Sequence, residues 1–278
     1  MIMKLDRFYY PGSKWLFYKL YCSRKGADEL LVRKVYQIVN LLYKHDIIEK
    51  WFFIRYYDPE FHVRVRFCLK RQEDISYVIS VMYEKFRISI KEKVIWKIQI
   101  DTYERELERY PAINDAESVF CIDSNMVLRI LRTVKQNYEV RWKIAVYIIE
   151  MYMSFYRHTN EQKMILLKYL LDSFKKEFGF DEHNSKSLNQ LYRMHRQEFM
   201  DIVNGNCCDE TYLHCVNVVQ QAKRILALYI KDSYCHKIVD YIHMSINRLF
   251  ISCNKQYELV FYFCLYKCYK SIVFLQKK

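Results

Sequence analysis

The stretch KWFFIRYYDPEFHVRVRFCLK, residues 50–70, holds two runs of strand-like residues on either side of a short turn. Aromatic and β-branched residues dominate both runs, as is typical of strands. The turn between them, residues 58–60, contains a proline, whose fixed φ favours a chain reversal. In residues 61–70 apolar side chains alternate with histidine and arginine, which is the period of a half-buried strand. The stretch therefore predicts a β-hairpin.

The segments on both sides make this hairpin the centre of a larger motif. Residues 14–22 and 94–103 have strand character, whereas residues 27–45 and 73–90 carry apolar residues at helical spacing. The order is therefore strand, helix, strand, strand, helix, strand. This order predicts a split βαβ, or ferredoxin-like, arrangement with an antiparallel βαββαβ sheet.

From about residue 114 the pattern changes to helices alone. Apolar residues recur near a period of 3.6 in these segments: 114–136, 139–158, 160–179, 184–205, 209–232, 233–253 and 255–274. The residues expected at helix starts are Asn114, Asn184 and Asp209, and those expected at helix ends are Gly179 and Gly205. We predict an α+β chain with a sheet portion at 1–112 and a helical portion at 113–278, packed as one compact domain.

The chain is basic, with a formal net charge of +13, but its lysines and arginines are spread along the sequence. Nucleic-acid-binding surfaces are usually clustered, so we expect no direct nucleic-acid contact and consider an acidic substrate instead. The N-terminus lacks the apolar core of a signal peptide, and the longest apolar run near the end, LVFYFCLY, is too short to span a bilayer. We expect a cytoplasmic protein whose ten cysteines are reduced.

A metal site is not expected from the cysteine pattern. The residues closest to such a pattern are Cys207, Cys208, His214 and Cys215. Adjacent cysteines are poor joint ligands, and no CxxC pair accompanies them.

The predicted strand 61–70 places His62, Arg64 and Arg66 on one face and its apolar residues on the other. Arg55, on the preceding strand, is expected to add a third guanidinium to this row. Arginine binds carboxylates and phosphates through a bidentate fork, so the row favours an anion-binding role. The alternative is an ordinary polar face of a half-buried sheet.

Two further segments carry charges at helical spacing. In DTYERELERYPA, residues 101–112, Glu106 and Arg109 lie three residues apart and can share a face of a helical turn. Arg105 and Glu108 form a second such pair, and both pairs can also be surface ion pairs of little energetic value. Considered together with the strand 61–70 and the segment 241–250, Glu106 and Arg109 are expected to point inward and Arg105 and Glu108 to form the solvated pair.

The other segment is YIHMSINRLF, residues 241–250. His243 and Asn247 share a helical side there, with Arg248 beside them. The alternative is a packed or surface histidine without a role in chemistry.

Taken in order and separation, these segments resemble the C-terminal domain of class I lanthipeptide dehydratases, a domain that also occurs as free-standing thiopeptide-type bacteriocin biosynthesis proteins. The family pattern has an Arg-Tyr before Asp-Pro, then His-x-Arg-x-Arg, a Tyr-x-Arg-Glu-x-x-Arg-Tyr-Gly-Gly segment, Asp-Ser, and His-Met near Asn-Arg. This chain departs from the pattern where Pro111-Ala112 replaces Gly-Gly. The turn that follows Arg109 must differ, because proline and alanine do not allow all the conformations open to glycine.

The resemblance implies a lyase that needs no cofactor. It would expel glutamate from glutamylated Ser or Thr of a ribosomal precursor peptide, leaving dehydroalanine or dehydrobutyrine. The catalytic residues that the resemblance implies are Arg64, Arg66, Glu106, Arg109 and His243. Residues expected to support substrate binding are Arg55, His62, Asn247 and Arg248. Either His243 or Glu106 could be the base, and Glu106 could instead orient Arg109 or His243.

The resemblance also implies partners and alternatives. The expected partners are the precursor peptide, a separate tRNA-dependent glutamylating protein and a second copy of the chain in a homodimer. One alternative function is a pyridine-forming cycloaddition on the same fold, and a second is a non-catalytic scaffold that binds the leader peptide. Product mass and sensitivity to Arg and His substitutions separate the three functions.

Overall fold

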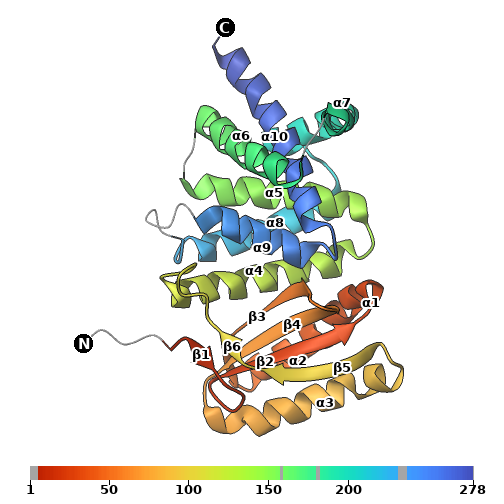
Figure 1. The fold of residues 1–278 in the computed structure, drawn as a ribbon, viewed down its shortest axis with the longest axis vertical. Helices are drawn as coiled ribbons and strands as arrows, with labels where there is room; N and C mark the ends of the chain where they lie inside the picture. Colours follow the sequence, from red (N-terminus) through yellow and green to blue (C-terminus); the bar gives the residue numbers. More distant parts are fainter. Residues whose placement is uncertain (1–5, 157–158, 180–181, 231–236, 278) are drawn as a thin grey trace, which may run out of the picture. The chain divides into compact units, whose positions relative to one another are not determined.

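The computed structural model describes residues 6–156, 159–179, 182–230 and 237–277. The chain divides into two compact units, Met1–Arg132 and Thr133–Lys278 (Figure 1). The first contains all of the strands that the structure describes and the helix that follows them, and the second contains helices. The long helix after residue 112 therefore belongs with the sheet. That the chain forms one compact domain stays a prediction.

The first unit is built on a four-stranded antiparallel sheet. Its strands are β2 (Trp15–Cys22), β3 (Ile48–Tyr57), β4 (Phe61–Leu69) and β5 (Ile95–Asp101), in the spatial order β3-β4-β2-β5. This is the strand order of the split βαβ motif, and each neighbouring pair is antiparallel. The predicted fold class and central hairpin are confirmed.

Helices cover one face of this sheet. The predicted helix 27–45 is a run of helical segments: α1 (Arg24–Glu29), the π-helical η1 (Leu30–Val35) and α2 (Tyr36–Lys44). The second helix of the motif, α3 (Ile75–Lys91), follows a single 3-10 turn, η2 (Gln72–Asp74). Helix α2 packs on α3 and β3, and α3 packs on β5. Apolar side chains of the strands, Val63 and Val65 among them, are fully buried in this core.

Helix α4 (Ile113–Val134) lies along the outer edge strand of the sheet, β3 (Figure 1). The Ser124 hydroxyl accepts a hydrogen bond of 3.2 Å from the backbone amide of Phe53. The indole of Trp51 donates to the Asn125 side chain at 3.0 Å. Unpaired backbone amides on an edge strand can pair with other chains. Helix α4 provides a hydrogen-bond acceptor for one of these amides, that of Phe53.

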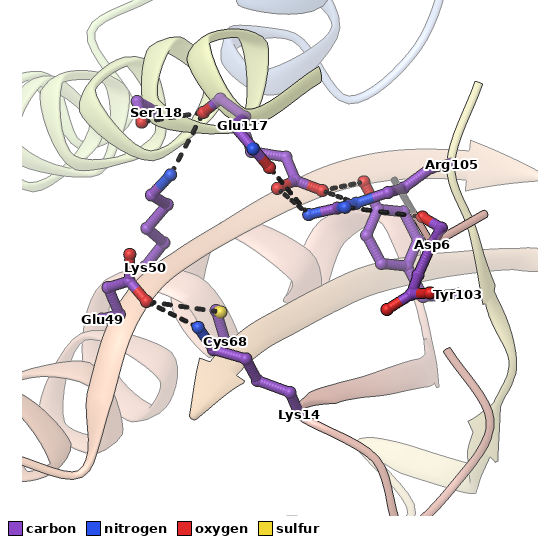
Figure 2. A network of polar contacts seen from close by, with 10 residues as sticks. Asp6, Lys14, Glu49, Lys50, Cys68, Tyr103, Arg105, Glu117 and Ser118 are labelled. Carbon is purple, nitrogen blue, oxygen red and sulfur yellow. Dashed lines mark hydrogen bonds and ion pairs between the residues drawn. The ribbon is translucent and has the colours of Figure 1, made fainter. Parts of the chain in front are cut away.

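A short second sheet joins the N-terminal end of the chain to the segment that leads into α4. Strand β1 (Phe8–Tyr9) pairs with β6 (Tyr103–Glu104). Directly after β6, the guanidinium of Arg105 forms a bidentate ion pair with Glu117 of α4, with N–O distances of 2.7 and 2.6 Å (Figure 2). The Tyr103 hydroxyl also donates to Glu117, at 3.0 Å. Only 1% of the Glu117 side chain is exposed, so this pair belongs to the core.

The second unit consists of helices. They are α5 (Tyr138–Met153), η3 (Ser154–Tyr156), α6 (Asn160–Glu177), α7 (Glu182–Asn204), α8 (Glu210–Leu226), α9 (Ile238–Leu249) and α10 (Asn254–Gln276). Helix α5 is apolar around most of its circumference and packs against α7, α8 and α9. Helix α10 packs against α6, α7 and α9.

Several predicted helix ends are confirmed, and others shift. The Asp209 side chain caps α8, and Gly179 and Gly205 follow α6 and α7 with positive φ. The starts expected at Asn114 and Asn184 are wrong, because α4 and α7 begin one and two residues earlier, at Ile113 and Glu182. Residues 231–236, on which part of two predicted helices falls, lie outside the described residues.

Among the described residues, no helix combines the length and the hydropathy that crossing a bilayer requires. The same residues contain no group of three or more His, Cys, Asp or Glu side chains placed to hold a metal ion.

The buried pair predicts a specific stability effect. Arg105→Met leaves the Glu117 carboxylate buried without its counter-charge, so the free energy of unfolding should fall by about 3 to 5 kcal/mol. Urea and thermal unfolding followed by tryptophan fluorescence would measure the loss. The double variant Arg105→Met/Glu117→Leu removes both charges and should recover much of it.

The matched control is Arg7→Ala, which removes ion pairs to Glu104 and Glu108 that are exposed to solvent. Its effect on unfolding should be far smaller than that of Arg105→Met. Equal losses for the two variants would contradict the assignment of the Arg105–Glu117 pair as a core element.

Candidate active site

The register of β4 shows which side chains share a face with its arginines. Directly opposed residues of neighbouring strands point to the same side of a sheet. We call the side that carries Arg64 and Arg66 the arginine face. The residues that the strand pairing places on this face are Phe52, Ile54, Tyr56, His62, Arg64, Arg66, Phe17, Lys19, Tyr21, Lys97, Gln99 and Asp101.

Arg64 is held on this face by neutral groups. Its Nε donates a hydrogen bond of 3.0 Å to Nε2 of His62, and its guanidinium carbon lies 3.4 Å from the ring centroid of Tyr56. Nδ1 of His62 lies 2.9 Å from the Glu60 carbonyl, which assigns the proton of the neutral ring to Nδ1. Burial lowers the pKa of His62, so the ring favours this neutral state. Arg64 also has a lowered pKa from burial, and it remains a cation because arginine does not deprotonate in proteins.

Arg66 lies among aromatic rings. Its guanidinium carbon is 4.2 Å from the centroid of Phe17, 5.2 Å from that of Phe52 and 4.8 Å from that of Tyr103. Cation–π contacts with several rings fix the position of the guanidinium and favour its charge. Arg66 is almost fully buried, so its electrostatic effect is screened less than that of a surface arginine.

A lysine that the sequence analysis did not single out completes the row. Lys19 of β2 is the cross-strand neighbour of Arg64 and forms an ion pair with Asp101 of β5. This pairing lowers the pKa of the Asp101 carboxyl. Lys19 is the only charged residue within the strand WLFYKLYC, and this was the signal available in the sequence.

The prediction that Arg55 adds a third guanidinium to this row is wrong. Arg55 lies opposite Val63, so it points to the face covered by helices. There it is buried and pairs with Asp28 of α1 at 2.6 Å. The register across the hairpin, which the alternation within one strand does not reveal, decides this face.

Residues 105–112 connect β6 to α4 through turns, and the inward and outward charges there are reversed from our expectation. Arg105 was expected in a solvated pair with Glu108, but it is buried against Glu117. Glu108 is exposed and pairs with Arg7 at 2.6 Å. Glu106 and Arg109, expected to point inward, pair at 3.4 Å with side chains that are 63% and 40% exposed. Their catalytic role stays a prediction, and their exposure leaves them accessible to a substrate.

Ring contacts connect the two sets of charges within the first unit. The guanidinium of Arg109 lies 5.5 Å from the Tyr110 ring. Tyr110 packs edge-on against Phe120 at 5.2 Å, and Phe120 packs on Phe52 at 5.4 Å. Phe52 in turn contacts Arg66, so a packed chain of aromatic side chains extends from the turn to the arginine face.

In the second unit, His243 of α9 is bonded to a carboxylate that the sequence analysis missed. Its Nδ1 lies 2.7 Å from Oε1 of Glu258 in α10. The Tyr262 hydroxyl donates to the other oxygen of Glu258 at 3.3 Å. The only sequence signal was a single acid at the edge of the apolar run LVFYFCLY.

The other two predicted residues of this segment differ in exposure. Asn247 lies one turn from His243 on α9 and is half-buried, whereas Arg248 is fully buried. Of the predicted catalytic residues, Arg64, Arg66, Glu106 and Arg109 belong to the first unit and His243 to the second. That they act on one substrate stays a prediction.

The chain belongs to the family described as "Lantibiotic biosynthesis dehydratase C-term", which matches residues 15–269. The resemblance stated from the sequence is therefore confirmed.

Two curated relatives carry names from lantibiotic pathways. The chain is 34% identical over 131 residues to subtilin biosynthesis protein SpaB of Bacillus subtilis, covering 46% of this chain and 12% of SpaB. It is 24% identical over 275 residues to nisin biosynthesis protein NisB of Lactococcus lactis subsp. lactis, covering 94% of this chain and 26% of NisB. The chain therefore spans only about a quarter of the length of NisB, and its match to SpaB covers a smaller share still.

Two solved structures share the fold. One is the tRNA-dependent lantibiotic dehydratase MibB of Microbispora sp. 107891, with a TM-score of 0.66 and 16% identity, covering all of this chain and 29% of MibB. The other is TbtD, a pyridine synthase from thiomuracin biosynthesis, with a TM-score of 0.66 and 11% identity, covering 97% of this chain and 100% of TbtD.

The buried state of His62 predicts how it titrates. Because burial lowers its pKa in the folded state, the NMR titration midpoint of this ring should lie below about 6.5. The unfolded chain then binds more protons at this residue than the folded chain near this pH. The contribution of His62 to the free energy of unfolding is therefore fully present above about pH 6.5 and is lost as the pH is lowered. His62→Gln should reduce this pH dependence, and a midpoint at or above 6.5 in the wild type would contradict the assignment.

Proposed function

We propose that this chain removes glutamate from glutamylated serine or threonine of a ribosomal precursor peptide, leaving dehydroalanine or dehydrobutyrine. The observation that carries the proposal is the arginine face, where Arg64 and Arg66 are fixed by rings and by a neutral histidine beside Lys19. Fixed cations of low exposure suit a reaction that releases a carboxylate. Membership of the dehydratase family supports the same reaction.

The elimination moves electrons in a balanced way. A base removes the Cα proton, and the C–H electron pair becomes the Cα–Cβ double bond. The Cβ–O bond breaks, and glutamate leaves as a carboxylate that carries the bonding pair. Negative charge develops on the peptide carbonyl during proton removal and on the leaving carboxylate during bond breaking. Arginines can stabilise both charges through N–H donors, with a bidentate fork for the carboxylate.

The remaining predicted residues have roles that fit their contacts. His243 can take and return the proton through Nε2, because Nδ1 is engaged by Glu258. Glu106 is hydrogen-bonded to Arg109, which suits an orienting role for the carboxylate. We assign Arg109 to the leaving glutamate. The glutamylated peptide would come from a glutamylating activity outside these 278 residues, and the proposal includes no bound cofactor.

The experiment is incubation of the purified protein with a glutamylated precursor peptide, followed by mass spectrometry. The expected product has lost one glutamate at each modified site and contains a dehydro residue. An unchanged glutamylated peptide, even after addition of the glutamylating partner, would overturn the proposal.

Substitutions then test the site. Arg66→Ala, Arg109→Ala and His243→Ala should each slow elimination by about 10²-fold or more, so that the glutamylated peptide accumulates. The matched control for Arg109→Ala is Arg87→Ala, because Arg87 is also an exposed arginine paired with a glutamate three residues before it. Arg87→Ala should eliminate at the wild-type rate. Normal elimination by all three site variants would remove the assignment.

A second candidate function is pyridine-forming cycloaddition, the activity named for TbtD, which shares the fold. This reaction would consume a peptide that already holds two dehydroalanines, form a macrocycle and release the leader. A third possibility, a scaffold that binds the leader without catalysis, predicts tight binding and no effect of the Arg and His substitutions. The mass of the product distinguishes the first two, and the substitutions distinguish the third.

A further inference from the structure

Glu258 is a buried carboxylate that has no role of its own in the proposed elimination. It lies in the second turn of α10, and only 1% of its side chain is exposed. Removing a carboxylate from water is costly unless hydrogen bonds or an opposite charge compensate it. Two groups do so here: Nδ1 of His243 at 2.7 Å from Oε1, and the Tyr262 hydroxyl at 3.3 Å from Oε2.

The two donors bond to different oxygens of the carboxylate. Tyr262 is one turn further along α10 and is fully buried. Burial raises its pKa well above the ordinary value, so the phenol keeps its proton and serves only as a donor to Glu258. The other oxygen, Oε1, is therefore available to accept a hydrogen bond from Nδ1 of His243 on α9.

The consequence for His243 concerns its tautomer. A carboxylate accepts hydrogen bonds, so Nδ1 of the neutral ring must carry the proton. Nε2 then has the lone pair that proton transfer requires. The His243 side chain is 31% exposed although its Nδ1 faces a buried acid, so the residue is not sealed in the core.

We infer that Glu258 is a positioning residue that fixes the orientation and tautomer of His243 for proton transfer at Nε2. This inference rests on the proposed glutamate elimination. Glu258 does not touch the reacting atoms and acts only through the imidazole. When the ring accepts the Cα proton, the carboxylate also stabilises the imidazolium that forms.

Kinetics of the full chain with a glutamylated peptide test the inference. Glu258→Gln, which keeps the size of the side chain, should lower kcat by between about 10²- and 10⁴-fold and leave KM nearly unchanged. In a His243→Ala background the same substitution should have no further effect, because its route of action is gone. A role in packing alone predicts losses that multiply in the double variant, and that result would overturn the inference.

Two matched variants separate positioning from folding. Glu150→Gln alters another partly buried carboxylate of the same unit, which bonds to Lys163 and Tyr269 and not to an imidazole. It should leave kcat unchanged. Tyr262→Phe removes the donor on Oε2 but retains the bond to Nδ1, so its kcat should fall far less than that of Glu258→Gln. Circular dichroism and thermal melting establish that each variant is folded.

A measurement on the wild type keeps the inference testable if Glu258→Gln does not fold. Side-chain ¹⁵N NMR of the neutral imidazole should show His243 with its proton on Nδ1. A ring protonated on Nε2 would overturn the inference. If the wild type does not eliminate glutamate at all, the proposed function fails, and the NMR result alone then decides whether Glu258 sets the tautomer.

Discussion

The buried ion pair between Arg105 and Glu117 is the constraint on which the sheet-containing unit depends. It joins the segment after the sheet's last strand to α4, the helix along the edge of β3. A guanidinium and a carboxylate in a core are tolerated only when their hydrogen bonds are well formed, so this pair restricts how the segment between β6 and α4 can run. The residue before strand β1 contacts the same segment, because the Arg105 amide donates to the Arg7 carbonyl at 2.8 Å. One interaction thus fixes how three parts of the chain meet.

The cations of this unit serve two different ends. Arg55 and Arg105 point into the core and bind carboxylates, which offset their charge where no water reaches them. The contacts described for Arg64 are with an imidazole and a phenol ring, which hold its position without cancelling its charge. Asp101, a carboxylate that also acts on Arg64, is itself paired with Lys19. Burial of an arginine therefore does not by itself support the proposed anion-binding role, whereas the chemistry of its contacts does.

Much of the fold was predictable because it follows from local periodicity. The alternation in strand 61–70 fixed the shared face of Arg64 and Arg66, and the order of periods gave the split βαβ sheet. The faces of Arg55 and Arg105 were not predictable, since they depend on register across a hairpin and on a partner in the next helix. Glu258 was missed for a related reason: the fold brings it to His243 across the connection between two helices. Whether the predicted catalytic residues act together cannot be predicted from local periodicity either, because they belong to two units of the chain.

Tyr103 contributes both to the packing around Arg66 and to the hydrogen bonds of Glu117. The position of Arg66 on the arginine face and the hydrogen bonding of the buried Glu117 therefore both depend on Tyr103. In a genetic screen for loss of the proposed activity, substitutions at Glu117 would score with those of the proposed catalytic residues, although its side chain is only 1% exposed. Mapping function from phenotype alone would therefore make the proposed active site too large, because it would include core residues that contact this tyrosine.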